Sequence, residues 1–163
     1  MRELQLIRSA DDKRRLDLEG VGSVRFENMW GTKLAFSAPA LDDLRIDGKG
    51  PFRRADVATD AAGHTVATLS CGRDKGRVEC GDRVVDVTGP LRGVLERRHP
   101  FEITENARDI ARVASRVWDE KPIDVTLIDE EFATRDPLLF LLALYVGNLV
   151  AASRSARAAA GVE

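Results

Sequence analysis

The stretch from Leu138 to Val146 constrains the fold most, because it is apolar on every side and contains no charged residue. Asp136 and Pro137 come directly before it, and these residue types favour the N-cap and the first position of a helix. A helix without a polar face has to be buried, either in a protein or in a membrane. The sequence therefore predicts a hydrophobic helix at about residues 137–152, followed by a tail at 153–163.

The length of this predicted helix argues against a membrane span. From Leu138 to Ala152 it covers roughly 22 Å at about 1.5 Å per residue, whereas the hydrocarbon layer of a bilayer is about 30 Å thick. Gly147 and Asn148 also interrupt its second half, and an amide is costly in lipid. We expect a protein that is not transmembrane, with this helix in its core.

The rest of the chain consists of short segments in which apolar and charged residues alternate, which is typical of half-buried strands. Turn-forming residues separate them. The expected strands are residues 3–7, 15–19, 21–26, 33–36, 44–46, 52–59, 65–70, 77–80, 83–88, 94–97, 101–105, 109–113 and 123–128. A barrel of this size needs an apolar filling, and no other segment is apolar enough to provide it. We predict a mostly β fold, an about twelve-stranded closed barrel around one hydrophobic C-terminal helix, with residues 1–163 in a single domain.

The charge balance and the cysteines narrow the class of protein. The chain has 25 basic and 27 acidic residues, a net charge of -2, which argues against nucleic-acid binding. The beginning of the sequence has no apolar signal-peptide core, so we expect a cytoplasmic protein with reduced thiols. Cys71 and Cys80 flank a turn-like stretch at 72–76, which leaves opposite positions in a hairpin and a cross-strand disulfide open as the alternative to two reduced thiols. With only His64 and His99 as further candidates, they fit no zinc spacing.

Four carboxylates gather just before the predicted helix, at Asp129, Glu130, Glu131 and Asp136. One interpretation is a site for a hard cation such as calcium. The other is an acidic loop that favours the positive end of the helix dipole. We favour the second, because the alternation of an EF-hand loop is absent.

Basic residues occur as pairs and in one turn. They are Arg14–Arg15, Arg53–Arg54 and Arg97–Arg98, together with Lys13, Arg73, Lys75 and Arg77. If they converge on one end of the barrel, they form a site for anionic lipid head groups. Charges scattered over strands also prevent sheet edges from aggregating, and this is the more common role.

Candidate catalytic residues are few. His64 follows Gly63 in a predicted turn, and His99 precedes Pro100. Neither belongs to a recognisable signature with a nucleophile, since Ser70, Cys71 and Cys80 lie in no nucleophile-elbow or Cys-His pattern. We therefore assign no catalytic, cofactor-binding or metal residue.

Tyr145 and Asn148 are three residues apart on the predicted helix and share one face. Because their polar groups need partners when buried, we expect hydrogen bonds to backbone at the rim of the barrel, with contact to a ligand as the alternative.

Two pairs of predicted strands and one apolar segment carry a resemblance to a known family. Residues 56–60 and 66–69 read as strand, turn and strand, and so do residues 102–105 and 110–113; the apolar segment 136–147 follows. This order resembles the tubby C-terminal-like fold, which includes the LURP-one-related proteins and the phospholipid scramblases. The resemblance implies a barrel threaded by its C-terminal helix, and the two strand pairs leave an internal duplication open.

The chain departs from the better-known members of that family where their functions reside. It lacks a proline-rich N-terminal arm, a cysteine-rich acylation stretch, a clean calcium-loop pattern and a matching Lys/Arg phosphoinositide pair. Lipid scrambling and binding residues are therefore not transferred. We expect a non-enzymatic binding or scaffold module, peripheral to the membrane through anionic phospholipid. The alternative is a soluble protein–protein interaction domain that binds its partner through barrel loops, and a weaker alternative is a small hydrolase.

Overall fold

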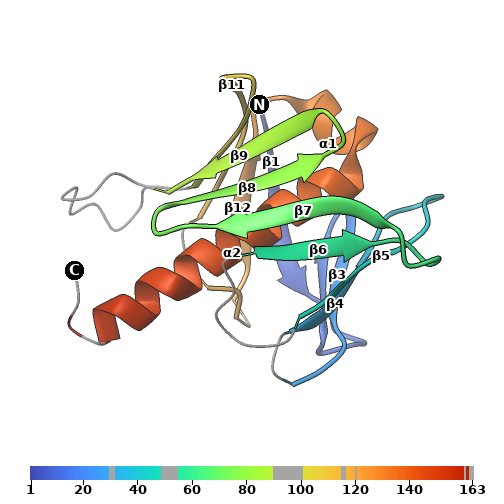
Figure 1. Cartoon of the computed structure of the whole chain (residues 1–163), viewed down its shortest axis with the longest axis horizontal. Coiled ribbons are helices and arrows are strands. Elements are labelled where there is room, and N and C mark those ends of the chain that lie inside the picture. The colour runs from blue at the N-terminus through green and yellow to red at the C-terminus, as the bar shows by residue number, and fades with distance from the viewer. Residues whose placement is uncertain are drawn as a thin grey trace.

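The computed structural model describes residues 1–29, 32–48, 55–89, 101–114, 117–119, 121–159 and 161, with side chains in the last helix as far as Ser153. Within these residues, twelve antiparallel strands form one closed barrel (Figure 1). They are β1 (Arg2–Arg8), β2 (Arg15–Leu18), β3 (Gly22–Phe26), β4 (Lys33–Ser37), β5 (Leu44–Asp47), β6 (Ala55–Thr59), β7 (Thr65–Cys71), β8 (Lys75–Cys80), β9 (Arg83–Thr88), β10 (Phe101–Glu105), β11 (Arg108–Val113) and β12 (Ile123–Leu127). The predicted mostly β barrel is confirmed.

The topology is the simplest available to such a chain. Each strand pairs with the strands before and after it in sequence, and β1 closes the barrel against β12. Alternation explains the strands: in β1, Leu4 and Leu6 are buried while Glu3, Gln5 and Ile7 are exposed. The expected strand at 94–97 and the first part of the one at 52–59 lie outside the described residues.

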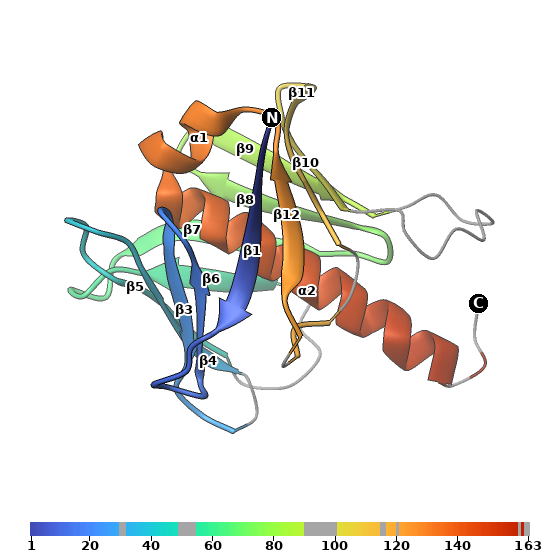
Figure 2. The ribbon, with the colours of Figure 1, turned by 180° about the vertical axis from the view of Figure 1, so that it is seen from behind.

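The long helix α2 (Pro137–Ala159) runs through the barrel. In both views it lies between β1 and β12 on one side and β6, β7 and β8 on the other (Figures 1 and 2). Every side chain from Leu139 to Val146 is buried. The predicted central helix is therefore confirmed. Among the described residues, no helix combines the length and the apolar character that a membrane crossing requires.

The end of α2 corrects the predicted boundary. A helix over 137–152 with a tail at 153–163 was expected, but the helix continues to Ala159. The prediction stopped where the apolar run stops, whereas the following alanine and arginine residues are themselves strong helix formers. The next helix-ending signal is Gly161, which has a φ of +71°. The last turns of α2 thus project beyond the barrel (Figures 1 and 2).

A short helix, α1 (Glu130–Arg135), replaces the expected acidic loop. Asp129 caps it, because its carboxylate accepts a hydrogen bond from the Phe132 backbone N–H at 3.2 Å. Phe132 is buried and meets the ring of Phe140 edge-on, with 6.3 Å between the ring centres. The helix is stabilised by a cap and one aromatic anchor, which hydrophobic periodicity does not reveal in so short a segment.

The two cysteines do not lie opposite each other, which excludes the hairpin placement that the sequence left open. Cys71 of β7 pairs with Gly76, and Cys80 at the end of β8 pairs with Arg83 of β9. The turn is shorter than expected, since β8 already begins at Lys75, and Cys80 is therefore carried several residues past Cys71. No disulfide joins the two sulfur atoms.

The two strand pairs that resemble each other in sequence are both antiparallel hairpins, β6–β7 and β10–β11. Each contains a register shift, at Ala58/Thr59 in the first and at Ile103/Thr104 in the second. The strand-turn-strand interpretation is confirmed for both, while duplication stays a hypothesis.

Candidate binding groove on β1

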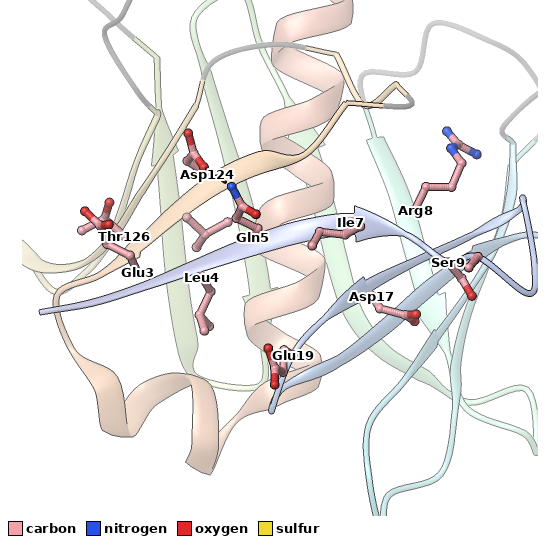
Figure 3. A pocket seen from close by; sticks show the side chains of 12 residues that line it. Glu3, Leu4, Gln5, Ile7, Arg8, Ser9, Asp17, Glu19, Asp124 and Thr126 are labelled. Carbon is pink, nitrogen blue, oxygen red and sulfur yellow. Dashed lines mark hydrogen bonds between the residues drawn. The ribbon is translucent and has the colours of Figure 1, made fainter.

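A half-open groove follows the outer side of β1 (Figure 3). Its volume is about 1080 Å³. Side chains from β1, from β2 with the turn that follows it, and from β12 line the groove. We refer to this feature as the β1 groove.

The groove arises because the two neighbours of β1 are staggered. β12 pairs with Arg2–Leu6 of β1, whereas β2 pairs only with Leu6–Arg8. β2 ends before the turn at Glu19, and β12 begins just after Pro122, which has no N–H to donate. Each neighbour therefore accompanies β1 along part of its length, and the surface is hollowed on both sides of the strand.

The charge of the groove is mainly negative. Its lining includes four carboxylates, from Glu3, Asp17, Glu19 and Asp124. Asp17 is paired with Arg15 at 2.8 Å, and Asp124 accepts a hydrogen bond from the Gln5 side-chain amide at 3.0 Å. Neither Glu3 nor Glu19 forms an ion pair within the described part of the chain. Within the described residues, these two carboxylates therefore have neither an ion pair nor a side-chain hydrogen bond.

Arg8 is the cation of the lining, and it is fixed at the other end of the groove from Glu3 (Figure 3). Its guanidinium group donates to the backbone carbonyls of Lys13 and of Asp119, the latter at 3.3 Å. Its buried Nε atom makes no hydrogen bond with the residues that the structure describes. Arg8 thus ties the end of β1 to two neighbouring loops, and the Glu3 end of the groove stays acidic.

The carboxylates predicted near the helix serve the fold. Asp129 caps α1 and lies 3.4 Å from Arg108, and Glu130 and Glu131 occupy the first turn of α1, where the helix dipole favours negative charge. Within the described ranges, no group of three or more potential ligands is arranged to hold a metal ion. The acidic stretch favours a helix N-terminus, as predicted, but the helix is α1.

Asp136 occupies the N-cap position of α2, since its backbone carbonyl accepts the N–H of Phe140 at 3.0 Å. Its carboxylate does not provide the expected side-chain cap. It binds Arg83 at 3.0 Å and Arg135 at 3.1 Å. Burial opposes the ionisation of Asp136, but the hydrogen bonds from these two arginines outweigh it and lower the pKa of the carboxyl.

Arg83 is a structural hub that the sequence did not reveal. It binds Glu105 at 2.8 Å and Asp136 at 3.0 Å, and its guanidinium carbon lies 5.5 Å from the centre of the Phe132 ring. The hydrogen bond to Glu105 is the main reason that the pKa of Arg83 is raised, and Asp136 adds to it. This network fastens the junction of α1 and α2 to β9 and β10.

Two of the basic residues are paired with carboxylates, one on the same strand and one on the neighbouring strand. Arg15 pairs with Asp17, and Arg77 pairs with Asp86 at 2.9 Å. The pairs at 53–54 and 97–98 lie outside the described residues. The convergence of these basic residues on one end of the barrel stays a prediction.

The described residues include one of the two histidines, His64. His64 is exposed in the β6–β7 turn, where its Nδ1 lies 3.4 Å from Asp60, while His99 lies outside the described ranges. The backbone N–H of His64 is the main cause that lowers the pKa of Asp60.

Asn148 satisfies its side chain as predicted. Its Oδ1 accepts a hydrogen bond from the backbone N–H of Trp118 at 2.8 Å. The backbone belongs to the loop before β12 and not to a strand. The ring of Tyr145 packs against Phe36 and Trp118, with ring centres 5.8 and 6.0 Å away. Both residues thus contact Trp118, which confirms that they share one face of the helix.

The chain matches no family model, no curated protein and no solved structure. The sequence analysis also missed the β1 groove. The alternation of Glu3, Gln5 and Ile7 shows which side of β1 faces outward, but it does not show that the neighbouring strands are staggered.

Proposed function

We propose that the protein is a non-enzymatic binding module that recognises a positively charged part of a partner protein through the β1 groove. The observation that carries this proposal is the pair Glu3 and Glu19, which form no ion pair within the described chain, in a groove large enough for several residues. Complementary charge at an interface speeds association and selects the partner. Ile7, 45% exposed in the same groove, offers an apolar contact.

The groove favours a protein partner over anionic phospholipid. The surface of an anionic membrane is negative and repels carboxylates that face it. Arg15 and Arg77, two of the residues predicted to contact head groups, are paired with carboxylates. The protein–protein alternative of the sequence analysis therefore becomes the preferred function, with its surface on β1 in place of the barrel loops.

We also propose that the chain belongs with the tubby C-terminal-like proteins. The support is architectural: a closed antiparallel barrel precedes a C-terminal helix that lies inside it. Because fold alone does not define function, the binding proposal depends on the groove and not on this kinship.

The proposal is tested with fluorescently labelled octalysine as a cationic probe, measured by anisotropy at low salt. We expect the double variant Glu3→Gln/Glu19→Gln to bind the probe about five- to thirtyfold more weakly, because each exposed charge pair contributes up to about 1 kcal/mol. The matched control is Asp42→Asn/Asp43→Asn, which removes the same charge from two exposed carboxylates without ion pairs in the described chain, between β4 and β5 and outside the groove.

Two results would contradict the proposal. One is equal loss of octalysine binding in both double variants, which would show a general charge effect. The other is wild-type protein that sediments with phosphatidylserine-rich vesicles in a salt-sensitive manner and does not bind octalysine, which would favour the lipid function.

A further inference from the structure

We infer that the β1 groove takes its partner as an extended segment laid along β1, with basic side chains at the Glu3 end and an apolar side chain at the Ile7 end. This inference rests on the proposed function and specifies the conformation and the order of the partner's residues. Three observations support it: the spacing of the exposed side chains on β1, the change in chemistry along the groove, and the pairing of β1 with both of its neighbouring strands.

The spacing of the exposed side chains on β1 favours an extended partner. Glu3, Gln5 and Ile7 all face outward, so exposed side chains recur at every second residue. This repeat is about 6.6 Å in a strand. A second extended segment that lies over the outer face of β1 has the same repeat. Every second side chain of that segment can therefore face Glu3, Gln5 or Ile7.

The groove changes in chemistry from one end to the other (Figure 3). Glu3, at the N-terminal end of β1, and Glu19, beside the middle of the strand, supply carboxylates without ion pairs (Figure 3). At the other end Ile7 is exposed, and the nearby carboxylate of Asp17 is already neutralised by Arg15. A partner that matches this surface therefore needs positive charge beside Glu3 and an apolar group beside Ile7. At about 3.3 Å per residue, the two groups are about two to four residues apart in an extended partner.

Recognition in this groove acts through side chains. β1 pairs with β12 on one side and with β2 on the other, so it offers no complete free edge to an added strand. Partners that complete a sheet bind mainly by backbone hydrogen bonds, whereas this groove selects a segment by the charge and size of alternate residues. The volume of about 1080 Å³ is at the upper limit of small-molecule pockets, and the groove is half open, which suits a peptide segment.

The test compares three labelled hexapeptides of one composition. In the first, lysine occupies positions one and three, leucine position five and threonine the rest. The second is its exact reversal, since the direction of binding is not fixed by the groove. In the third, the two lysines and the leucine are consecutive. We expect one alternating peptide to bind at least about fivefold tighter than the consecutive peptide.

The Ile7→Thr variant separates the apolar contact from the charge contact. It should weaken the better alternating peptide several-fold and leave octalysine binding unchanged. Val57→Thr is the matched control, because Val57 is an equally exposed branched residue, 46% accessible, on β6 outside the groove. Thermal unfolding of both variants verifies that they remain folded.

The inference about an extended partner and the proposed binding function are contradicted by different results. If all three peptides bind equally and Ile7→Thr has no effect while Glu3→Gln/Glu19→Gln still weakens octalysine, the groove attracts cations without reading their order, and this inference is overturned alone. If Glu3→Gln/Glu19→Gln leaves octalysine binding unchanged, the proposed function itself fails.

Discussion

Gly76 of β8 lies directly against the central helix. A Cβ atom at this position would lie 2.1 Å from Cγ1 of Val146 on α2 and 3.1 Å from the carbonyl oxygen of Ser70. The absence of a side chain is therefore what allows α2 to lie so close to β8. The sequence analysis places Gly76 in a turn, because a glycine next to charged residues usually marks one; the contact with a helix residue 70 positions later is not visible locally.

We predict that Gly76→Ala lowers the free energy of unfolding by about 1–3 kcal/mol, the usual cost of overpacking a filled core. Urea denaturation measures the change. Gly72→Ala is the control, since the nearest atom to a Cβ there is 3.4 Å away. In a Val146→Ala background the clashing methyl group is gone and the cost of Gly76→Ala should shrink; an identical cost in both backgrounds would show that the two residues do not interact.

At the scale of elements, α2 is the part of the molecule on which every strand depends. Leu141 lies in its middle and is fully buried, 0% exposed. Its Cδ1 lies 3.0 Å from the position that a Cβ atom of Gly22 would occupy on β3. This side chain does not reach solvent and is surrounded by the hydrophobic core, so a charge placed there is buried among apolar side chains.

We predict that Leu141→Asp unfolds the protein. Burying an unpaired carboxylate costs several kcal/mol, and a whole domain is stable by only about 5 to 15 kcal/mol. Leu141→Met, which conserves volume and polarity, should cost less than about 1.5 kcal/mol. Circular dichroism during heating distinguishes the two. A Leu141→Asp protein with an unchanged melting temperature would show that α2 is not the core.

The elements that could be predicted from sequence are those with a strong local pattern. The alternation in β1 and the unbroken apolar run of α2 predict both elements directly. α1 has no such pattern, because a single cap at Asp129 and one aromatic residue stabilise it. The groove depends on how β1 meets β12, for example through Gln5 and Asp124, which are 119 positions apart. Pairing at that distance leaves no signal in either segment alone.

At the scale of the whole molecule, the barrel and the helix cannot be separated. The inner side chains of the strands and the buried side chains of α2 form one hydrophobic core. Without α2, the barrel would enclose an apolar space that water fills poorly, and its wall would have nothing to pack against. The helix therefore takes the place that a second sheet occupies in a sandwich.

We predict that a chain ending at Asp136 aggregates, whereas a chain ending at Ser153 stays monomeric. The first lacks the whole filling of the barrel, and the second keeps all the α2 side chains that the structure shows as buried. Size-exclusion chromatography with light scattering measures the outcome. A monomeric, folded protein ending at Asp136 would mean that the strands form a stable barrel by themselves.

The placement of α2 also decides when the protein can fold as the ribosome makes it. β1 emerges first but closes the barrel only with β12, and α2 is synthesised after every strand that surrounds it. No strand pair has its core partner until α2 has left the ribosome. Open strand edges and apolar faces are exposed for this whole interval, which is the state most prone to aggregation. The barrel can thus close around its core only after α2 has emerged, and the nascent strands need protection from aggregation most in the interval just before that point.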